Sequence, residues 1–197
     1  IAWMQNWDTL SIASLKAPWF GQMTLPRELS VQNGRLYQWP VRELDALRSG
    51  HISYQDVAFE GELTLEGVKG RTVDVTITLR PSDEGQAYKK FAVWFGQDDT
   101  HHTGISFRPY ESVLKIDRKF SGSRRAIIHQ RRCKVPKNGG RLTFRMILDR
   151  FSVEVFVNNG EQVLSATMYT DQSADRFKFL ADGKVVMDVE KYDLDMG

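Results

Sequence analysis

The chain has 197 residues, of which 41% are hydrophobic and 26% are charged, a balance typical of a folded globular domain. It contains no run of about 18 consecutive apolar residues, which excludes an ordinary membrane-spanning helix. The single cysteine, Cys133, excludes an internal disulfide framework and a metal site with several thiolate ligands. We therefore expect a domain that is stabilised by its own hydrophobic core.

The net charge of +2 conceals a basic segment. Between Lys115 and Arg150 there are twelve Lys or Arg residues and two acids, Asp117 and Asp149. The favoured interpretation is that these cations face solvent from strands and keep sheet edges soluble. The alternative is a docking surface for an acidic partner or a phosphate. A nucleic-acid site is disfavoured because no recognisable motif accompanies the charge.

The first fifty residues form an aromatic connector. They hold four of the five tryptophans, at positions 3, 7, 19 and 39, and show little regular patterning. The one helical signal in the chain is residues 40–48, where Pro40 suits a first turn and Leu44 and Leu47 lie on one side.

The rest of the chain alternates apolar and polar residues with a period of two, the pattern of strands with one face in a core. Val73, Val75 and Ile77 share one face of such a segment. Similar segments are 62–66, 91–95, 104–107, 113–117, 126–131, 142–149, 152–157, 176–180 and 184–194. Tight hairpin turns are predicted at 33–34, 138–139, 159–160 and 182–183, where Asn or Asp precedes Gly. The pattern predicts an all-β fold, a two-sheet antiparallel β-sandwich of the concanavalin A-like or jelly-roll type.

Five blocks of the sequence match a known family. Near the N-terminus these are residues 3–7 (WMQNW), 19–29 (WFGQMTLPREL) and 35–44 (RLYQWPVREL). Later blocks are residues 113–118 (VLKIDR) and 149–160 (DRFSVEVFVNNG). Together they resemble glycoside hydrolase family 32, the β-fructosidases that include invertase, levanase and sucrose-6-phosphate hydrolase. Phe151 stands where the family usually has Ser, so this chain lacks the serine hydroxyl at that position and any role for it is weakened.

The resemblance implies three parts. Residues 1–25 correspond to the end of the last blade of a five-bladed catalytic propeller, 26–50 to a linker, and 51–197 to the C-terminal β-sandwich. The chain opens at Ile1 inside a strand-like block, so we expect the propeller to lie upstream. The first fifty residues are then expected to be mobile, or to pair with another copy of the chain as a homo-oligomer.

The resemblance also implies a function for the parent protein. The family hydrolyses β-D-fructofuranosidic bonds by a retaining double displacement that uses two carboxylates. Its catalytic motifs Asn-Asp-Pro-Asn-Gly, Arg-Asp-Pro and Glu-Cys do not occur in this chain. We therefore expect no catalytic residue in this chain, no cofactor and no metal. The expected partner is the chain's own propeller, with fructose-containing saccharides bound through it and with neither nucleic acid nor membrane involved.

Four other sites were considered. The resemblance places Trp3 at the rim of the fructose pocket in the intact parent, although a packing role is equally compatible with the sequence. Asp149 and Glu154 are expected on opposite faces of a strand, which excludes an acid–base pair between them. Cys133 has no obvious base, which disfavours a nucleophile. His101 and His102 lack a third ligand at matching spacing, which disfavours a metal site.

The strongest competing function is an independent carbohydrate-binding, lectin-like module. Sandwiches of this kind often bind glycans, and Trp94 and Tyr110 are aromatic residues that could be exposed. A lectin should bind a glycan without the propeller, whereas a structural module should not.

Overall fold

The computed structural model describes residues 1–4, 21–83, 86–122 and 129–195. The strands in these ranges are β1 (Arg27–Gln32), β2 (Arg35–Pro40), β3 (Arg48–Leu63), β4 (Val73–Pro81), β5 (Lys90–Gln97), β6 (Thr103–Arg108), β7 (Val113–Asp117), β8 (Gln130–Lys134), β9 (Leu142–Asp149), β10 (Ser152–Val157), β11 (Gln162–Thr167) and β12 (Arg176–Leu194). Two short 3-10 helices, η2 (Arg42–Leu47) and η3 (Asn158–Gly160), complete the regular elements. No helix in the described ranges is long and apolar enough to cross a membrane.

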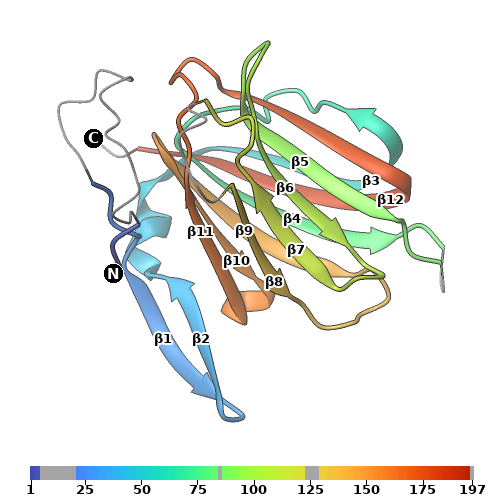
Figure 1. Ribbon diagram of the computed structural model, residues 1–197, viewed down its shortest axis with the longest axis horizontal. Coiled ribbons are helices and arrows are strands. Elements are labelled where there is room, and N and C mark those ends of the chain that lie inside the picture. The colour runs from blue at the N-terminus through green and yellow to red at the C-terminus, as the bar shows by residue number, and fades with distance from the viewer. Residues whose placement is uncertain (5–20, 84–85, 123–128, 196–197) are drawn as a thin grey trace.

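The strands form an antiparallel β-sandwich, as predicted (Figure 1). Hydrogen bonds connect them in the order β11-β10-β9-β4-β12-β5-β6-β7-β8, and β3 pairs with β12. The long strand β12 joins the two layers, because Arg176–Asp182 pair with β5 whereas Val185–Asp193 pair with β4. At the ends of the path β8 and β11 contact each other, so the two layers enclose one core.

The core is built from the alternation seen in the sequence. Val73, Val75, Ile77 and Leu79 all point inward from β4 and are almost fully buried. The largest side chains of this core that are fully buried are Phe91, Phe95, Phe144 and Phe179. Burial of each such side chain contributes about 1.5–3 kcal/mol, so the sandwich has its own source of stability.

One predicted turn is wrong. Residues 176–180 and 184–194 were expected to be two strands separated by a turn at Asp182-Gly183, but they form the single strand β12. The positive φ of Gly183, 89°, serves a bulge, and the register against β3 shifts between Ala181 and Val185. The Asn33-Gly34 turn is confirmed, since both residues have positive φ and join β1 to β2.

Other element bounds also differ from the prediction. Residues 62–66 were expected as a separate strand, but 62 and 63 are the end of the much longer β3. The segment 126–131 lies partly outside the described residues, and the strand there is β8. The pattern missed β1, β2 and β11, whereas the short helix predicted over 40–48 is present as η2.

The connector packs on the outer face of β9 and β10. All six residues of β10 are buried, so both faces of that strand are covered. A second apolar cluster forms there, separate from the core: Leu44, Ile147, Phe156 and Leu194, with Leu25, Trp39 and Val163 packed against it. Leu25, Trp39 and Leu44 therefore attach part of the connector to the sandwich, whereas most of β1 is exposed. The expectation that the first fifty residues are mobile or pair with another copy of the chain stays a prediction.

Candidate functional site

A buried carboxylate fastens the connector to the sandwich. Glu154 on β10 is 3% exposed and accepts the backbone N–H of Leu25 at 2.5 Å through Oε1. Its Oε2 accepts Nη2 of Arg27 at 2.5 Å, and the same nitrogen donates to Ser165 Oγ at 2.8 Å. The Arg27 guanidinium also lies 5.5 Å from the ring centre of Phe156. Both carboxylate oxygens of Glu154 therefore bind the segment at the start of β1.

A second ionic cluster lies beside it on the same face. Asp74 on β4, only 1% exposed, accepts Nε and Nη2 of Arg145 at 2.9 and 2.7 Å. It also accepts Nε of Arg48 at 2.7 Å, and Arg145 reaches Asp45 of η2 at 2.7 Å. Burial alone lowers the pKa of Arg145, but the hydrogen bonds and charges of Asp74 and Asp45 raise it above its usual value. The cluster therefore joins η2 and β3 to the sheet as ions.

Asp149 and Glu154 do not lie on opposite faces, so that expectation is wrong. A turn separates their strands, and Asp149 pairs with Ser152 while Glu154 pairs with Ile147, which puts both carboxylates on the outer face. Both oxygens of Glu154 are already bonded to the connector, and Asp149 Oδ1 accepts the backbone N–H of Arg150. Their contacts are structural, at the hairpin and between the connector and the sheet.

At the N-terminus Trp3 forms a short antiparallel bridge with Met23. The flanking bonds join Ala2 N–H to Thr24 Oγ1 at 2.8 Å and Met4 N–H to Gln22 O at 2.9 Å. The Trp3 side chain is 51% exposed. The other tryptophans of the first two resemblance blocks, at positions 7 and 19, lie outside the described residues.

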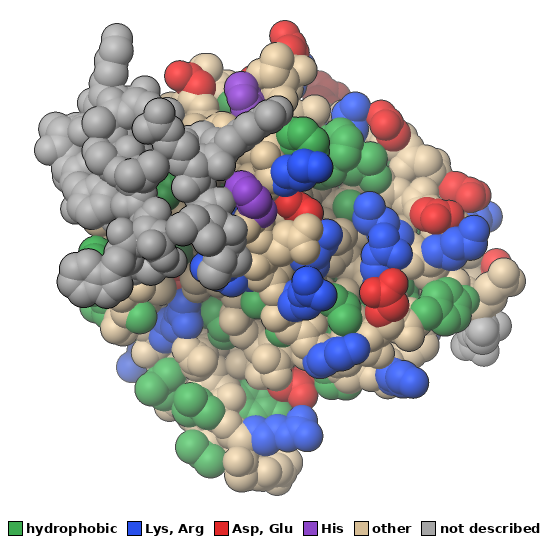
Figure 2. All heavy atoms as spheres, viewed as in Figure 1, with side chains coloured by type: hydrophobic (Ala, Val, Ile, Leu, Met, Phe, Trp, Pro, Cys, Tyr) green, Lys and Arg blue, Asp and Glu red, His purple; other side chains and the backbone are tan. Residues whose placement is uncertain are grey.

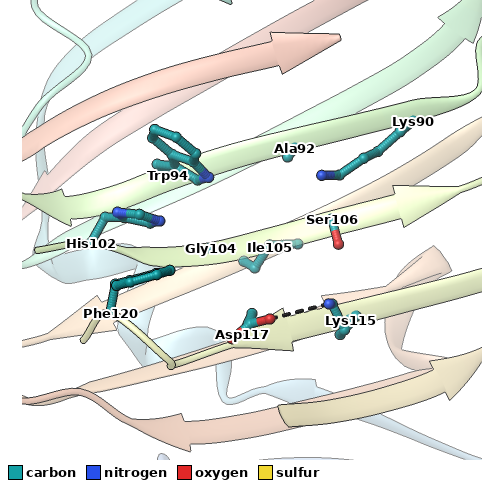
Figure 3. A pocket seen from close by; sticks show the side chains of 10 residues that line it. All are labelled: Lys90, Ala92, Trp94, His102, Gly104, Ile105, Ser106, Lys115, Asp117 and Phe120. Carbon is teal, nitrogen blue, oxygen red and sulfur yellow. Dashed lines mark hydrogen bonds and ion pairs between the residues drawn. The ribbon is translucent and has the colours of Figure 1, made fainter. Parts of the chain in front are cut away.

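A small hollow opens on the outer face of the other layer, over β5, β6 and β7 (Figure 3). Its volume is about 130 Å³. Its floor is formed by the small residues Ala92, Gly104 and Ser106 of β5 and β6. The aromatic rings of Trp94, His102 and Phe120 lie at one end. The charged side chains are Lys90 at the other end and Lys115 and Asp117 along β7.

The aromatic rings form a continuous wall. Trp94 and His102 stack with ring centres 4.1 Å apart, and His102 stacks with Phe120 at 5.4 Å. A side chain at Gly104 would bring a Cβ to 3.3 Å from Trp94 Cδ1, so the glycine lets the indole lie close to β6. Burial, opposed by the charge of Asp117, lowers the pKa of His102, which keeps the ring neutral at pH 7.

Asp117 is fixed in the hollow as a carboxylate. Oδ2 accepts Lys115 Nζ at 3.1 Å and Gln130 Nε2 at 2.9 Å, and Oδ1 accepts the backbone N–H of Lys119 at 3.0 Å. Burial alone raises the pKa of Asp117, but these hydrogen bonds and the charge of Lys115 lower it below its usual range. The hollow therefore presents a carboxylate, ammonium groups and rings together.

The sequence singled out only part of this hollow. Trp94 was considered as an exposed aromatic, but Tyr110, at 65% exposure, lies elsewhere and donates its hydroxyl to Ala87 O. Lys90 was not singled out, and Asp117 was noted only as an acid in the basic segment and as part of the 113–118 block. The antiparallel register provides the missing signal, because Trp94 pairs with Gly104 and Gly104 with Asp117 across three strands.

The remaining candidates have structural explanations. Burial raises the pKa of Cys133 to about 11, so its thiol is protonated at neutral pH. His101 Nδ1 contacts the Thr100 hydroxyl at 2.7 Å in a loop. Nowhere in the described ranges do three His, Cys, Asp or Glu side chains gather as metal ligands. In the described part of the basic segment Arg118 and Arg145 are buried. Figure 2 shows exposed Lys and Arg side chains, with several acids among them, on the face viewed.

One family model covers the β-sandwich from η2 to the end of β12. The model of the glycosyl hydrolases family 32 C-terminal domain matches residues 43–194. The chain belongs to glycosyl hydrolase family 32. The N-terminal domain model of the same family matches residues 1–40, so a family 32 boundary falls inside the connector.

Curated relatives carry related activities in their names. The chain is 28% identical over 194 residues to a levanase of Bacillus sp. (strain L7), covering 93% of this chain and 21% of the levanase. It is 32% identical over 180 residues to a sucrose-6-phosphate hydrolase of Escherichia coli, covering 86% of this chain and 33% of that enzyme. The chain thus spans well under half the length of these relatives.

Solved structures share the fold. An exo-inulinase from Aspergillus awamori superimposes with a TM-score of 0.79 at 20% identity, covering 98% of this chain and 39% of that one. A fructan 1-exohydrolase IIa from Cichorium intybus gives a TM-score of 0.75 at 17% identity, covering 90% and 42%. At such identities these likenesses establish the β-sandwich and its N-terminal connection.

Proposed function

We propose that this family 32 chain is the packing module of an enzyme that hydrolyses β-D-fructofuranosidic bonds in sucrose, sucrose 6-phosphate or fructans. The family match over residues 43–194 carries the proposal, and the names of the relatives, levanase and sucrose-6-phosphate hydrolase, indicate the substrate class. Chemistry then proceeds by retaining double displacement on carboxylates of the catalytic domain. The sandwich stabilises that domain by covering its surface.

The packing surface proposed here is the apolar face of the β1–β2 hairpin. The hairpin extends away from the sandwich, and hydrophobic side chains gather on it (Figures 1 and 2). Leu29, Val31 and Leu36 are 64%, 72% and 52% exposed, and Val31 pairs with Leu36 on one face. Adjacent exposed aliphatic side chains mark an interaction surface. On this proposal residues 1–25 belong to the last propeller blade, 26–50 link, and 51–197 form the module.

A serine pair on the hairpin tests this packing. In the 197-residue chain, Leu29→Ser with Val31→Ser should change the free energy of unfolding by about 0.5 kcal/mol or less, because both side chains already face solvent. In the full-length enzyme the same pair should cost roughly 2–4 kcal/mol, since two aliphatic contacts are lost. Thermal unfolding of both proteins measures the difference.

The matched control is Tyr110→Ser, an equally exposed residue on the sandwich, which loses its hydrogen bond to Ala87 O and should cost the same in both proteins. Equal losses in the chain and in the full-length enzyme would contradict the packing role. If sedimentation shows that the unmodified chain is a dimer and the serine pair is a monomer, the hairpin joins two copies of the chain instead.

Activity assays test the proposed reaction. The full-length enzyme should release fructose from sucrose or levan, and the 197-residue chain should release none, because the family's catalytic motifs do not occur in it. Hydrolysis by the 197-residue chain alone would refute the assignment of catalysis to the separate catalytic domain.

On this proposal Trp3 lies at the rim of the fructose pocket of the intact enzyme, where a ring packs on a sugar. Trp3→Ala in the full-length enzyme should raise KM by roughly three- to tenfold with little change in kcat. An unchanged KM would refute the placement of Trp3 at the pocket rim.

A further inference from the structure

The hollow over β5–β7 contains hydrogen-bond donors without partners. Among the described residues, Nζ of Lys90, Oγ of Ser106 and Nε1 of Trp94 donate to no other protein group. Figure 3 shows the amine of Lys90 extending over the floor above Ser106, with the indole nitrogen of Trp94 on the side of the hollow. Three donors from two neighbouring strands therefore converge on one small space, the arrangement expected of a polar ligand site.

The hollow carries charged groups of both signs, which suits a ligand that both donates and accepts hydrogen bonds. Lys115 is paired with Asp117 at 3.1 Å, so of the two cations that line the hollow only Lys90 has no partner among the described residues. The Asp117 carboxylate can accept further hydrogen bonds, since each carboxylate oxygen has more than one lone pair. An anion placed here meets that carboxylate, whereas a hydroxyl group can donate to Asp117 and accept from Lys90.

The shape of the hollow favours a single ring. A volume of about 130 Å³ lies well below the 300–1,000 Å³ of drug-sized pockets, so one small ring of a longer molecule is the matching size. The wall of Trp94, His102 and Phe120 offers an apolar surface to C–H groups. A molecule with C–H groups on one side and hydroxyl groups on its edges is a sugar.

We propose that the hollow formed by Lys90, Trp94, Ser106 and Asp117 binds one unit of a neutral saccharide. The hydroxyl groups of the sugar donate to Asp117 and accept from Lys90, Ser106 and the Trp94 indole, while its C–H groups pack on the aromatic wall. The hollow lies over β5–β7, in the layer opposite the one on which the connector packs. The sandwich then holds a polysaccharide near the enzyme that cuts it.

Nuclear magnetic resonance of the indole N–H groups provides a direct test. The ¹⁵N-labelled 197-residue chain is titrated with sucrose, a short levan oligosaccharide and maltose, and Trp94→Phe assigns the Trp94 signal. For a Kd of about 1 mM, titration to about 50 mM reaches saturation. The Trp94 indole signal should shift saturably with at least one saccharide.

The lysine pair at 89 and 90 supplies a matched comparison. Lys90→Gln should weaken binding about tenfold, the effect of losing a hydrogen bond to a charged donor. Lys89→Gln removes the same charge from the adjacent residue. Because the Lys89 side chain pairs with Asp182 outside the hollow, this variant should leave the Kd unchanged. Equal effects of the two variants on the Kd would show that binding depends on net charge rather than on Lys90, and would overturn the site.

The outcomes separate this site from the proposed hydrolysis. Saturable binding of maltose alone supports a saccharide site while contradicting its link to fructosides, which rests on the proposed function. No shift with any saccharide overturns the site and leaves the activity of the full-length enzyme untouched. A shift with inorganic phosphate and not with sugars also overturns it, because the hollow is then an anion site.

Discussion

Asp74→Ala should lower the stability of the chain by about 3–5 kcal/mol, the range measured when one partner of a buried ion pair is removed. The carboxylate is 1% exposed and holds Arg145 and Arg48 together. Without it Arg145 and Arg48 share only Asp45, a half-exposed carboxylate, and water has little access to Arg145. For a protein of this size the loss corresponds to a fall in Tm of roughly 10 °C.

The control for this variant is Asp188→Ala. Asp188 on β12 pairs with Arg80 of β4 at 2.7 Å, but both side chains are about a fifth exposed, so water replaces the lost partner. The expected cost is about 1 kcal/mol. Thermal and chemical unfolding of both variants checks the difference. Equal losses would mean that burial of Asp74 contributes nothing beyond a surface ion pair.

The layer architecture was predictable because alternation carries most of its energy. The inward residues of β4, from Val73 to Leu79, are apolar at every second position and lie in the core as expected. The sequence could not distinguish a hairpin turn from a bulge at Gly183, because both use a positive φ. Only the pairing of β12 with strands on both of its edges decides between them.

The connector contacts were less predictable because they join residues distant in sequence. Glu154 alternates with apolar neighbours, a pattern typical of a solvent-facing position, yet Leu25 and Arg27 cover it from 127 or more residues away. The hollow illustrates the same limit. Trp94 was a candidate from the sequence, but only the register of three strands places Gly104 and Asp117 beside it.

The two outer faces of the sandwich therefore differ in kind. The face of β9 and β10 is covered by apolar side chains and buried ions of the connector, an arrangement suited to a permanent contact. The face of β5–β7 keeps polar side chains around an open hollow, an arrangement suited to an exchangeable ligand. Damage to the first should alter the attachment of the connector, whereas damage to the second should leave stability nearly unchanged.

Glu154→Ala should release the connector while leaving the sandwich folded. The variant removes the acceptor of both the Leu25 N–H and the Arg27 guanidinium, and it leaves the Arg27 charge without its buried partner. A loss of about 3 kcal/mol at this contact raises the opening equilibrium of the connector roughly 100-fold. The core around β5 and β6 does not include these groups, so its opening should be unaffected.

Amide hydrogen exchange distinguishes this local opening from global unfolding. In Glu154→Ala the amides of Leu25 and of β1 and β2 should exchange up to roughly 100-fold faster, with little change in β5 and β6. Glu161→Ala serves as the control, because Glu161 also joins the hairpin to the sandwich, through Arg35, but that arginine is 70% exposed and the pair should contribute less than about 1 kcal/mol. If β5 and β6 accelerate as much as Leu25, the connector and the sandwich open as one cooperative unit, and Glu154 stabilises the whole fold rather than the attachment.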